Sequence, residues 1–409
     1  MAQLALAPAR AMSDLTRLTF RNPVNPLTHT PLGKNLAAGA ELFERMTRRY
    51  GKPAFGLAST LVDGRQVAVT ERVIWARPYC QLIHFERADV APAPRLLIVA
   101  PISGHYATLL RGTVEAFLPH FDVYITDWTD ARMVPLALGR FDLDDYIDYL
   151  TEIMHALGAR EPRMPLHTLG VCQPSVPLLA AIGLMEAAGD PLAPTSMTLM
   201  GGPIDTRRSP TAVNQLAQKR GTEWFRRNCI VTVPFPYPGV GREVYPGFLQ
   251  LSGFMAMNFD KHVNAHVEMF NHLVEGDGDS AEKHRDFYDE YLAVMDLDAD
   301  YYMQTIDTVF VAHHLPNGTM KHRDWPVDLK AITRVALMTV EGEKDDISGV
   351  GQTQAAHDLC VNIPANRKTH HLQMGVGHYG VFNGSRFRRD IVPRILEFAR
   401  GAQSTFKPG

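Results

Sequence analysis

Residues 166–175, LHTLGVCQPS, decide the fold. The apolar run 166–169 predicts a strand buried on both faces, and the run 176–188 predicts a helix. A tight turn in such a context lifts one side chain above the sheet, and here that side chain is Cys172. The usual pattern of this turn is Gly-x-Ser-x-Gly, from which Cys172 and Pro174 depart. Because proline is tolerated in the first turn of a helix, the departure weakens the motif without excluding it.

The segments on either side of this turn alternate between strand and helix. Apolar runs predict buried strands, and apolar residues at helical spacing predict the helices between them. The strands are expected at 95–100, 121–128 and 196–200, and the helices at 108–118 and 143–157. Strands and helices of this length in alternation predict an α/β fold with a doubly wound, mostly parallel sheet.

The alternation is interrupted by residues 204–328, which are rich in aromatic residues, Met, Asn and His. Helical patterns such as 281–295 predict that this block is a helical cap, inserted before the late strands. The sheet is therefore expected in two parts, residues 66–203 and residues 329–409. The second part is predicted to hold strands at 335–340 and 368–374 and helices at 352–359 and 386–400.

The N-terminal segment, residues 1–65, precedes the sheet. Residues 1–36 are rich in Pro, Asn and Thr and predict an irregular arm. A helix is expected from about Leu36, and Gly51 ends it. Residues 66–87 alternate between apolar and polar side chains, which predicts two strands of a hairpin or meander.

Composition excludes several classes of protein. The chain has 409 residues, of which 45% are hydrophobic and 21% charged, as in a soluble globular protein. The net charge of −3 removes the electrostatic argument for nucleic acid binding. Four cysteines are too few for a disulfide scaffold and suit a reducing compartment. Since no charged leader precedes an apolar run, and no run of about 18 apolar residues occurs, we expect neither a signal peptide nor a membrane span.

Two further segments carry residues that suit Cys172 chemically. The strand 335–340 is followed by EGEKDDI, and the spacing from Gly342 favours Asp345 over Asp346 as an orienting acid. The strand 368–374 is followed by GVGHYG, whose glycines allow a loop to carry His378 over the sheet. The chain order is then nucleophile, acid and histidine, as in α/β-hydrolases. A solvated turn, or a cap for the next helix, is the alternative for both aspartates.

The loop after the strand 95–100 supplies a fourth element. Its residues Ser103 and Gly104 are expected to aim a backbone N–H at a developing oxyanion, together with the N–H of Gln173. A simple turn with a packed tyrosine is the alternative for this loop. Side chains expected to line the substrate site are His105, Tyr106 and Tyr379.

These residues predict acyl transfer through a cysteine. His378, oriented by Asp345, takes the proton of Cys172 or forms a thiolate–imidazolium pair with it. The thiolate attacks an ester or thioester carbonyl, and an acyl-cysteine forms. No metal or cofactor is predicted. The remaining cysteines, which lack this context, are expected to be packing residues: Cys80, Cys229 and Cys360.

The motifs together resemble those of the intracellular poly(3-hydroxybutyrate) depolymerases. The resemblance covers about residues 20–400 and rests on LGVCQPSVP, PISGHYATLLRGT, VEGEKDDISG and GVGHYGVFNG, with the cap segment DYYMQTIDTVF. It implies an α/β-hydrolase fold and assigns Cys172 as nucleophile, Asp345 as acid and His378 as base. It also implies a cytoplasmic enzyme on polyester storage granules that releases 3-hydroxybutyrate oligomers or monomer. The family shares the proline of the turn, so Pro174 no longer counts against the site.

Two other functions compete with this interpretation. A polyhydroxyalkanoate synthase has a similar triad, but its turn ends in glycines, whereas this chain has Gln173-Pro174-Ser175. A non-catalytic granule-binding protein would need neither the triad nor the glycine loops. The acyl acceptor (water or coenzyme A), the site of cleavage along the polymer, the chain-length preference and the formation of a homo-oligomer stay open.

Overall fold

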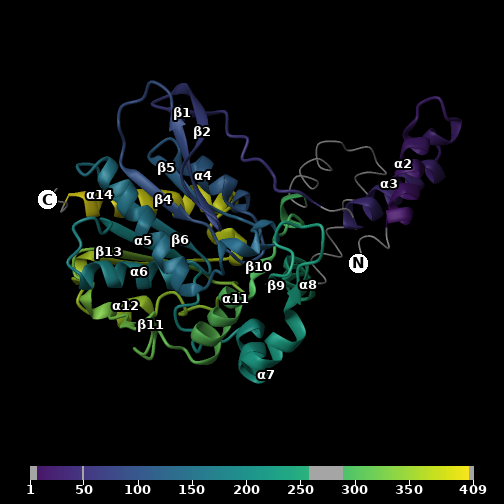
Figure 1. The fold of residues 1–409 in the computed structure, drawn as a ribbon. Helices are drawn as coiled ribbons and strands as arrows, with labels where there is room; N and C mark the ends of the chain where they lie inside the picture. Colours follow the sequence, from purple (N-terminus) through teal and green to yellow (C-terminus); the bar gives the residue numbers. More distant parts are fainter. Residues whose placement is uncertain (1–6, 48–49, 258–288, 405–409) are drawn as a thin grey trace. The chain divides into compact units, whose positions relative to one another are not determined.

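The computed structural model describes residues 7–47, 50–257 and 289–404. The chain divides into two compact units, which are shown in Figure 1. One unit combines residues 1–53 with residues 248–294, and the other combines residues 54–247 with residues 295–409. This division groups the chain differently from the four predicted segments, because part of the predicted cap falls in the N-terminal unit.

The N-terminal unit contains a pair of helices where the sequence predicts an irregular arm. Helix α2 (Ala7–Arg21) and helix α3 (Pro31–Thr47) pack against each other. The short helix η1 (Pro26–His29) joins them, and the side chain of Asn25 caps it. The prediction of an irregular arm is therefore wrong for these residues. The Pro, Asn and Thr residues lie mainly in the connecting turn, while Pro8 stands in the first turn of α2, where proline is tolerated.

The second unit is built on a nine-stranded sheet with the order β1-β2-β3-β5-β4-β6-β7-β13-β14. The first three strands and β5 pair antiparallel, and the pairs from β5 to β14 are parallel. The strands are β1 (Ser59–Val62), β2 (Arg65–Arg77), β3 (Cys80–Arg87), β4 (Arg95–Val99), β5 (Asp122–Trp128), β6 (Leu166–Val171), β7 (Ser196–Met200), β13 (Ala336–Gly342) and β14 (Lys368–Gln373).

This strand order identifies the fold. An antiparallel start is followed by parallel strands in which β5 lies outside β4, and helices connect the parallel strands. This is the α/β-hydrolase fold, so the predicted fold class is confirmed. The strands β4, β6 and β7 are fully buried along their length, as their continuous apolar sequences predict.

Helices cover both faces of the sheet (Figure 1). Helix α5 (Leu143–Arg160) packs against α6 (Ser175–Ala187) on one face, and a capping box of Asp142 and Asp145 begins α5. The other face carries α4 (Arg111–Phe117) and α14 (Val392–Gln403). The predicted helix at 352–359 is shorter than expected, because only α12 (Ala356–Leu359) is helical.

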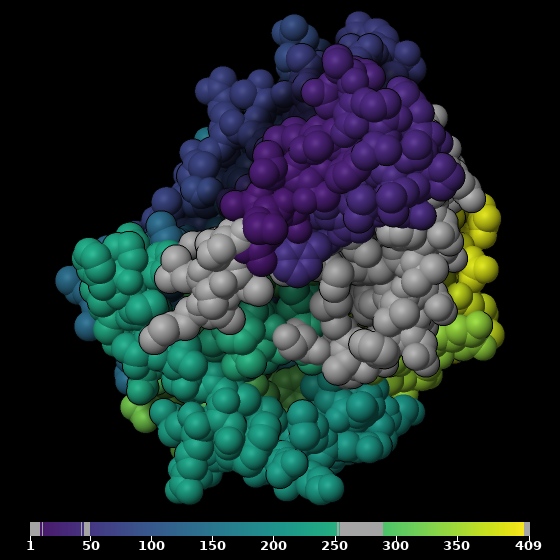
Figure 2. Space-filling model, turned by 90° about the vertical axis from the view of Figure 1, so that its right-hand side faces the viewer, coloured from purple at the N-terminus to yellow at the C-terminus, as the bar shows by residue number. Residues whose placement is uncertain are grey.

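The cap contains strands as well as helices. It includes α7 (Ala212–Cys229), which lies on the surface in Figure 2, and α11 (Ala299–Thr305) with the π-helix η5 (Ile306–Val311). A small antiparallel sheet joins β8 (Val231–Thr232), β9 (Glu243–Tyr245) and β10 (Leu297–Asp298). A local core holds the helices together, formed by Ala217, Phe225, Met303 and Ile306. Helix α8 (Gly247–Met257) follows β9, and the predicted helical pattern 281–295 lies mostly outside the described residues.

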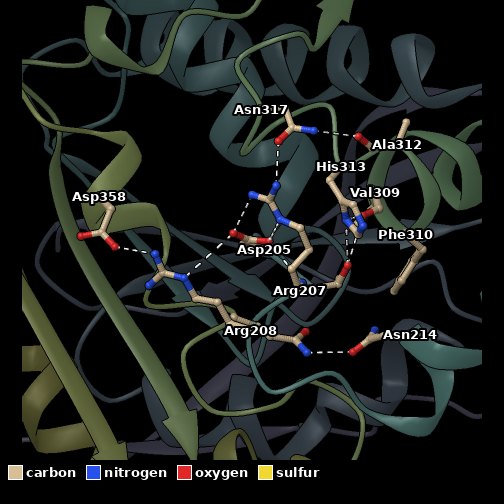
Figure 3. A network of polar contacts seen from close by, with 12 residues as sticks. Asp205, Arg207, Arg208, Asn214, Val309, Phe310, Ala312, His313, Asn317 and Asp358 are labelled. Atoms are coloured by element: carbon tan, nitrogen blue, oxygen red, sulfur yellow. Dashed lines mark hydrogen bonds and ion pairs between the residues drawn. The ribbon is translucent and has the colours of Figure 1, made fainter. Parts of the chain in front are cut away.

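A polar network around Asp205 fastens the first residues of the cap, which follow β7, to a later part of the cap and to α12 (Figure 3). The Arg207 guanidinium donates to both oxygens of the Asp205 carboxylate, at 2.8 and 3.0 Å. Arg207 also donates to Asn317 in the cap at 2.8 Å, and Arg208 bridges to Asp358 of α12 at 2.7 Å. The network therefore joins the segment after β7 to two other segments, each more than a hundred residues further along the chain.

Replacing Asp205 by asparagine is expected to destabilise the protein by about 1 kcal/mol at neutral pH, since both arginines are partly exposed. Burial raises the pKa of Asp205, but hydrogen bonds and charge from Arg207 outweigh burial, so the pKa lies below its ordinary value. The carboxylate therefore stabilises the fold above the unfolded pKa of about 3.9, and the effect is lost as pH falls through the folded pKa.

Urea unfolding of Asp205→Asn and wild type at pH 7 and near pH 3 measures this effect. The difference in unfolding free energy should be largest at pH 7 and shrink at the lower pH. Asp324→Asn, at an exposed position, is the matched control and should leave the unfolding free energy unchanged. A difference for Asp205→Asn that is independent of pH would contradict the assigned ion pair.

Candidate active site

The turn after β6 holds Cys172 in a strained backbone conformation. Cys172 has φ of 67°, in the left-handed region that side chains other than glycine rarely adopt. Its N–H donates to the carbonyl of Met200 on β7 at 2.7 Å, and its carbonyl accepts from the N–H of Ser175 at 3.1 Å. These bonds fix both sides of the turn, so the strain is sustained by the surrounding structure. The thiol stands half-buried at the top of the sheet.

Glycine allows close packing at two positions beside this turn, Gly170 on β6 and Gly202 after β7. A Cβ on Gly202 would lie 2.1 Å from the Ser175 hydroxyl oxygen, and one on Gly170 would lie 3.0 Å from Leu178. The close approach lets α6 begin directly after the turn, with Pro174 at its N-cap. Ser175, the other hydroxyl in this motif, is completely buried, so it does not share the position of Cys172.

The structure brings His378 and Asp345 into direct contact. Asp345 follows β13, and His378 begins the short helix η8 (His378–Val381) after β14. Nδ1 of His378 lies 2.7 Å from Oδ2 of Asp345, and both side chains are buried. The other carboxylate oxygen accepts the N–H groups of Ile347 and Ser348 at 2.9 and 2.8 Å. The carboxylate is therefore held in place on both sides, whereas the alternative acid Asp346 is exposed.

His378 also lies close enough to Cys172 for the cysteine side chain to act on its pKa. Burial alone lowers the pKa of His378, but the charges of Asp345 and Cys172 and their hydrogen bonds outweigh burial. The pKa of His378 consequently lies well above its ordinary value of 6.5. The imidazolium form is thus favoured at neutral pH, which suits a thiolate–imidazolium pair.

A second buried carboxylate, Glu341 near the end of β13, supports the site from behind. It accepts the backbone N–H groups of Gly351, Thr353 and Gln354 at 2.7 to 2.9 Å. The Thr353 hydroxyl in turn donates to the carbonyl of Gly202 at 3.0 Å. Glu341 therefore orders the loop that packs beside the cysteine turn. Sequence reasoning missed this role because its partners are backbone groups, which leave no pattern in the sequence.

The loop after β4 reaches the same edge of the sheet. β4 and β6 are adjacent parallel strands, so the loops at their carboxyl ends lie side by side. Gly104 has φ of 98°, and its carbonyl accepts the N–H of Met295 at 2.7 Å. This arrangement holds the backbone of residues 103–104 beside the turn that carries Gln173. The assignment of the N–H groups of Ser103, Gly104 and Gln173 to an oxyanion hole stays a prediction.

The three residues expected to line the substrate site occupy different environments. His105 and Tyr106 are buried, and the Tyr106 hydroxyl lies 3.5 Å from Oδ2 of Asp130. Asp130 also binds Arg132, which places Tyr106 at the edge of a polar network. Tyr379 is half-buried, with its ring centroid 6.0 Å from that of His378. Tyr379 therefore lies directly against the histidine.

The other cysteines lack the means to act as nucleophiles. Cys80 and Cys360 are buried, and burial raises the pKa of Cys360 to about 12. Burial also raises the pKa of Cys229, which packs against the core of the cap. A thiol with a raised pKa carries little thiolate at neutral pH, which argues against Cys229 and Cys360 as nucleophiles.

A protein-family model described as PHB de-polymerase C-terminus matches residues 201–403. This matched part of the chain belongs to the PHB depolymerase family. This membership confirms the resemblance predicted from the motifs, and the family with the fold makes the chain an ester hydrolase. The matched PHB depolymerase segment contains Asp345 and His378 and begins after Cys172.

Several solved structures are similar to this PHB depolymerase family member. A carboxyl esterase from Bacillus coagulans is 12% identical, with a TM-score of 0.48, and covers 82% of this chain and 99% of its own. A thermophilic esterase from Thermogutta terrifontis is 12% identical, with a TM-score of 0.42 and coverage of 84% and 97%. A monoacylglycerol lipase from Paleococcus ferrophilus is 10% identical, with a TM-score of 0.42 and coverage of 76% and 96%. No curated protein sequence matches the chain.

Among the described residues of this PHB depolymerase family member, no helix is both long and apolar enough to span a membrane.

Proposed function

We propose that the chain is an intracellular poly(3-hydroxybutyrate) depolymerase with a Cys172–His378–Asp345 triad. One observation carries the proposal. His378 contacts the Asp345 carboxylate at 2.7 Å and lies close enough to Cys172 to be affected by it, and that thiol stands on a strained turn at the carboxyl edge of the sheet. Family membership supports the polyester as substrate. The proposed location is the cytoplasm, on the surface of storage granules.

The first half of the reaction forms an acyl-cysteine. The Cys172 thiolate attacks the carbonyl carbon of an ester, an S–C bond forms, and the carbonyl π electrons move to the oxygen. The N–H groups of Gln173 and of residues 103–104 stabilise this oxyanion. When the oxyanion collapses, the C–O bond of the ester breaks, and the leaving alkoxide takes the proton of His378.

The second half returns the enzyme to its starting state. Neutral His378, oriented by Asp345, removes a proton from water, and the hydroxide attacks the acyl-cysteine. The S–C bond breaks, the carboxylic acid leaves, and the thiolate and the imidazolium are restored. The Asp345 carboxylate orients the imidazole and stabilises the imidazolium.

Purified protein incubated with native amorphous poly(3-hydroxybutyrate) granules tests this function. We expect soluble 3-hydroxybutyrate or its oligomers to appear in wild-type reactions and to be absent when the active-site thiol is removed. A synthase would instead release coenzyme A from 3-hydroxybutyryl-coenzyme A while polymer mass increases. A binding protein would sediment with the granules and release no product, and no release by the wild type would refute the depolymerase function.

A further inference from the structure

Helix α11 of the cap places a buried tyrosine next to the nucleophile turn. Tyr301 is 1% exposed, and its ring packs against Phe141 at 5.7 Å and Tyr146 at 5.8 Å between centroids. The helix is anchored at its start by Asp298, which caps it and accepts hydrogen bonds from the buried Arg242 and Tyr79. Tyr301 is therefore held firmly in one position by aromatic packing and by this buried ion pair.

Three polar side-chain atoms are buried in this region. Within the described residues, none of them makes a hydrogen bond of ordinary geometry. They are Oε1 of Gln173, the hydroxyl oxygen of Tyr301 and the hydroxyl oxygen of Thr305. Tyr301 lies close enough to Gln173 and Thr305 for both side chains to act on its pKa. Thr305 stands one turn after Tyr301 on the same helix, and Gln173 directly follows Cys172. The group therefore joins the cap to the catalytic turn.

The chemistry of this group suits a single oxygen atom as ligand. Burial raises the pKa of Tyr301 well above its ordinary value, and the nearby Cys172 raises it further, so the hydroxyl stays neutral and able to donate. Oε1 of Gln173 only accepts, whereas both hydroxyls donate or accept. Buried polar atoms without partners are rare, because each loses its hydrogen bonds to water. An oxygen placed between them restores those bonds, and an alkyl group does not.

We propose that Gln173, Tyr301 and Thr305 bind the oxygen on C3 of the acyl chain attached to Cys172. The inference rests on the proposed function, because a 3-hydroxyacyl chain carries this oxygen two carbons beyond the carbonyl that the thiolate attacks. Gln173 directly follows Cys172 in the sequence, and Cys172 interacts electrostatically with Tyr301. It selects 3-hydroxyacyl esters against plain acyl esters, since a plain chain leaves the three atoms unpaired.

Two chromogenic esters separate this role from a structural one: p-nitrophenyl 3-hydroxybutyrate and p-nitrophenyl butyrate. In Tyr301→Phe we expect kcat/KM for the 3-hydroxybutyrate ester to fall about 10- to 100-fold, the effect of leaving a buried partner unpaired. The butyrate ester should change less than about threefold, so the preference for the 3-hydroxyl is lost. Thr305→Val, which also removes one hydroxyl, should shift the preference in the same direction.

Tyr302→Phe is the matched control. Tyr302 is the next residue of α11, and its ring stacks on Tyr245 at 3.9 Å instead of facing the nucleophile turn. Removing the Tyr302 hydroxyl should leave the preference for the 3-hydroxybutyrate ester over the butyrate ester unchanged. Thermal unfolding of all variants reports whether each still folds.

The other outcomes overturn the inference. An equal fall for both esters would mean that the three atoms hold a water molecule or support the turn. An unchanged preference in both Tyr301→Phe and Thr305→Val would also refute the oxygen site, while leaving the proposed function intact. A wild type that hydrolyses neither ester would refute this inference, and one that also releases no product from granules would refute the proposed function with it.

Discussion

Replacing Cys172 by alanine is expected to lower ester hydrolysis by at least about 10³-fold, to the level of the reaction without covalent catalysis. The thiolate forms the S–C bond of the proposed intermediate, and alanine offers no atom that can take its place. The position is also distinctive, because Cys172 adopts φ of 67° and lies close enough to His378, which contacts Asp345, to act on the pKa of that imidazole. Initial rates with p-nitrophenyl butyrate and with granules measure the loss.

Two variants control for this result. Cys229→Ala removes a half-buried thiol in the cap, and its rate should stay within about twofold of the wild type. Ser175→Ala removes the only hydroxyl of the motif 170–175, whose side chain is completely buried and lies 3.5 Å from the carbonyl of Gly170. If Cys172→Ala retained activity while Ser175→Ala lost it, Ser175 would be the nucleophile and the assignment of Cys172 would be wrong.

The second large effect is expected for Asp345→Asn, which should reduce kcat by about 10³- to 10⁴-fold. The carboxylate accepts a hydrogen bond from Nδ1 of His378 at 2.7 Å and thereby fixes the orientation and tautomer of the ring. An amide in its place donates as well as accepts, so the wrong tautomer of the imidazole becomes favoured. The side chain keeps its volume, and the fold should persist.

The same variant should change the pH dependence of the rate. In the wild type, burial lowers the pKa of His378, while Asp345 and Cys172 raise it by a larger amount. Removing the Asp345 charge removes a raising contribution and leaves the burial in place, so the pKa must fall. The thiolate–imidazolium pair is lost when His378 deprotonates, and the alkaline limb of kcat/KM should therefore move to lower pH.

Asp346→Asn is the control for this experiment. Asp346 carries the same charge at the next position but is exposed, so its rate and pH profile should match those of the wild type. If Asp346→Asn lost activity and Asp345→Asn did not, the choice between the two aspartates would be reversed. If Asp345→Asn lowered the rate without moving the alkaline limb, Asp345 would not act through the charge of His378.

The strands and their loops could be predicted because their signals are local. The strand that leads to Cys172 is a short apolar run with a glycine at its end, and burial on both faces permits no other composition. Asp345 follows β13, a later strand of the same kind, whereas His378 follows β14, a more polar and mostly half-buried strand at the edge of the sheet. Since parallel strands point the same way, their loops are expected at one edge of the sheet, and the structure brings the acid and the histidine together there.

The N-terminal helices show where a local signal misled. The residues that favour turns lie mainly in the connection around Asn25. Because they dominate the composition of residues 1–36, neither α2 nor the start of α3 at Pro31 was predicted. Composition averages over a segment, whereas a helix depends on the spacing of residues along it.

The sequence by itself determined the fold class, the family and the three residues proposed for catalysis, because apolar runs, turn residues and motif order are written along the chain. Only the tertiary structure decided which groups surround them. Glu341 reaches backbone groups ten or more residues away, and Tyr301 meets Gln173 across more than a hundred residues. Such contacts depend on where the chain returns in space, and a hydrogen bond between distant residues imposes no period or spacing on the sequence that carries it.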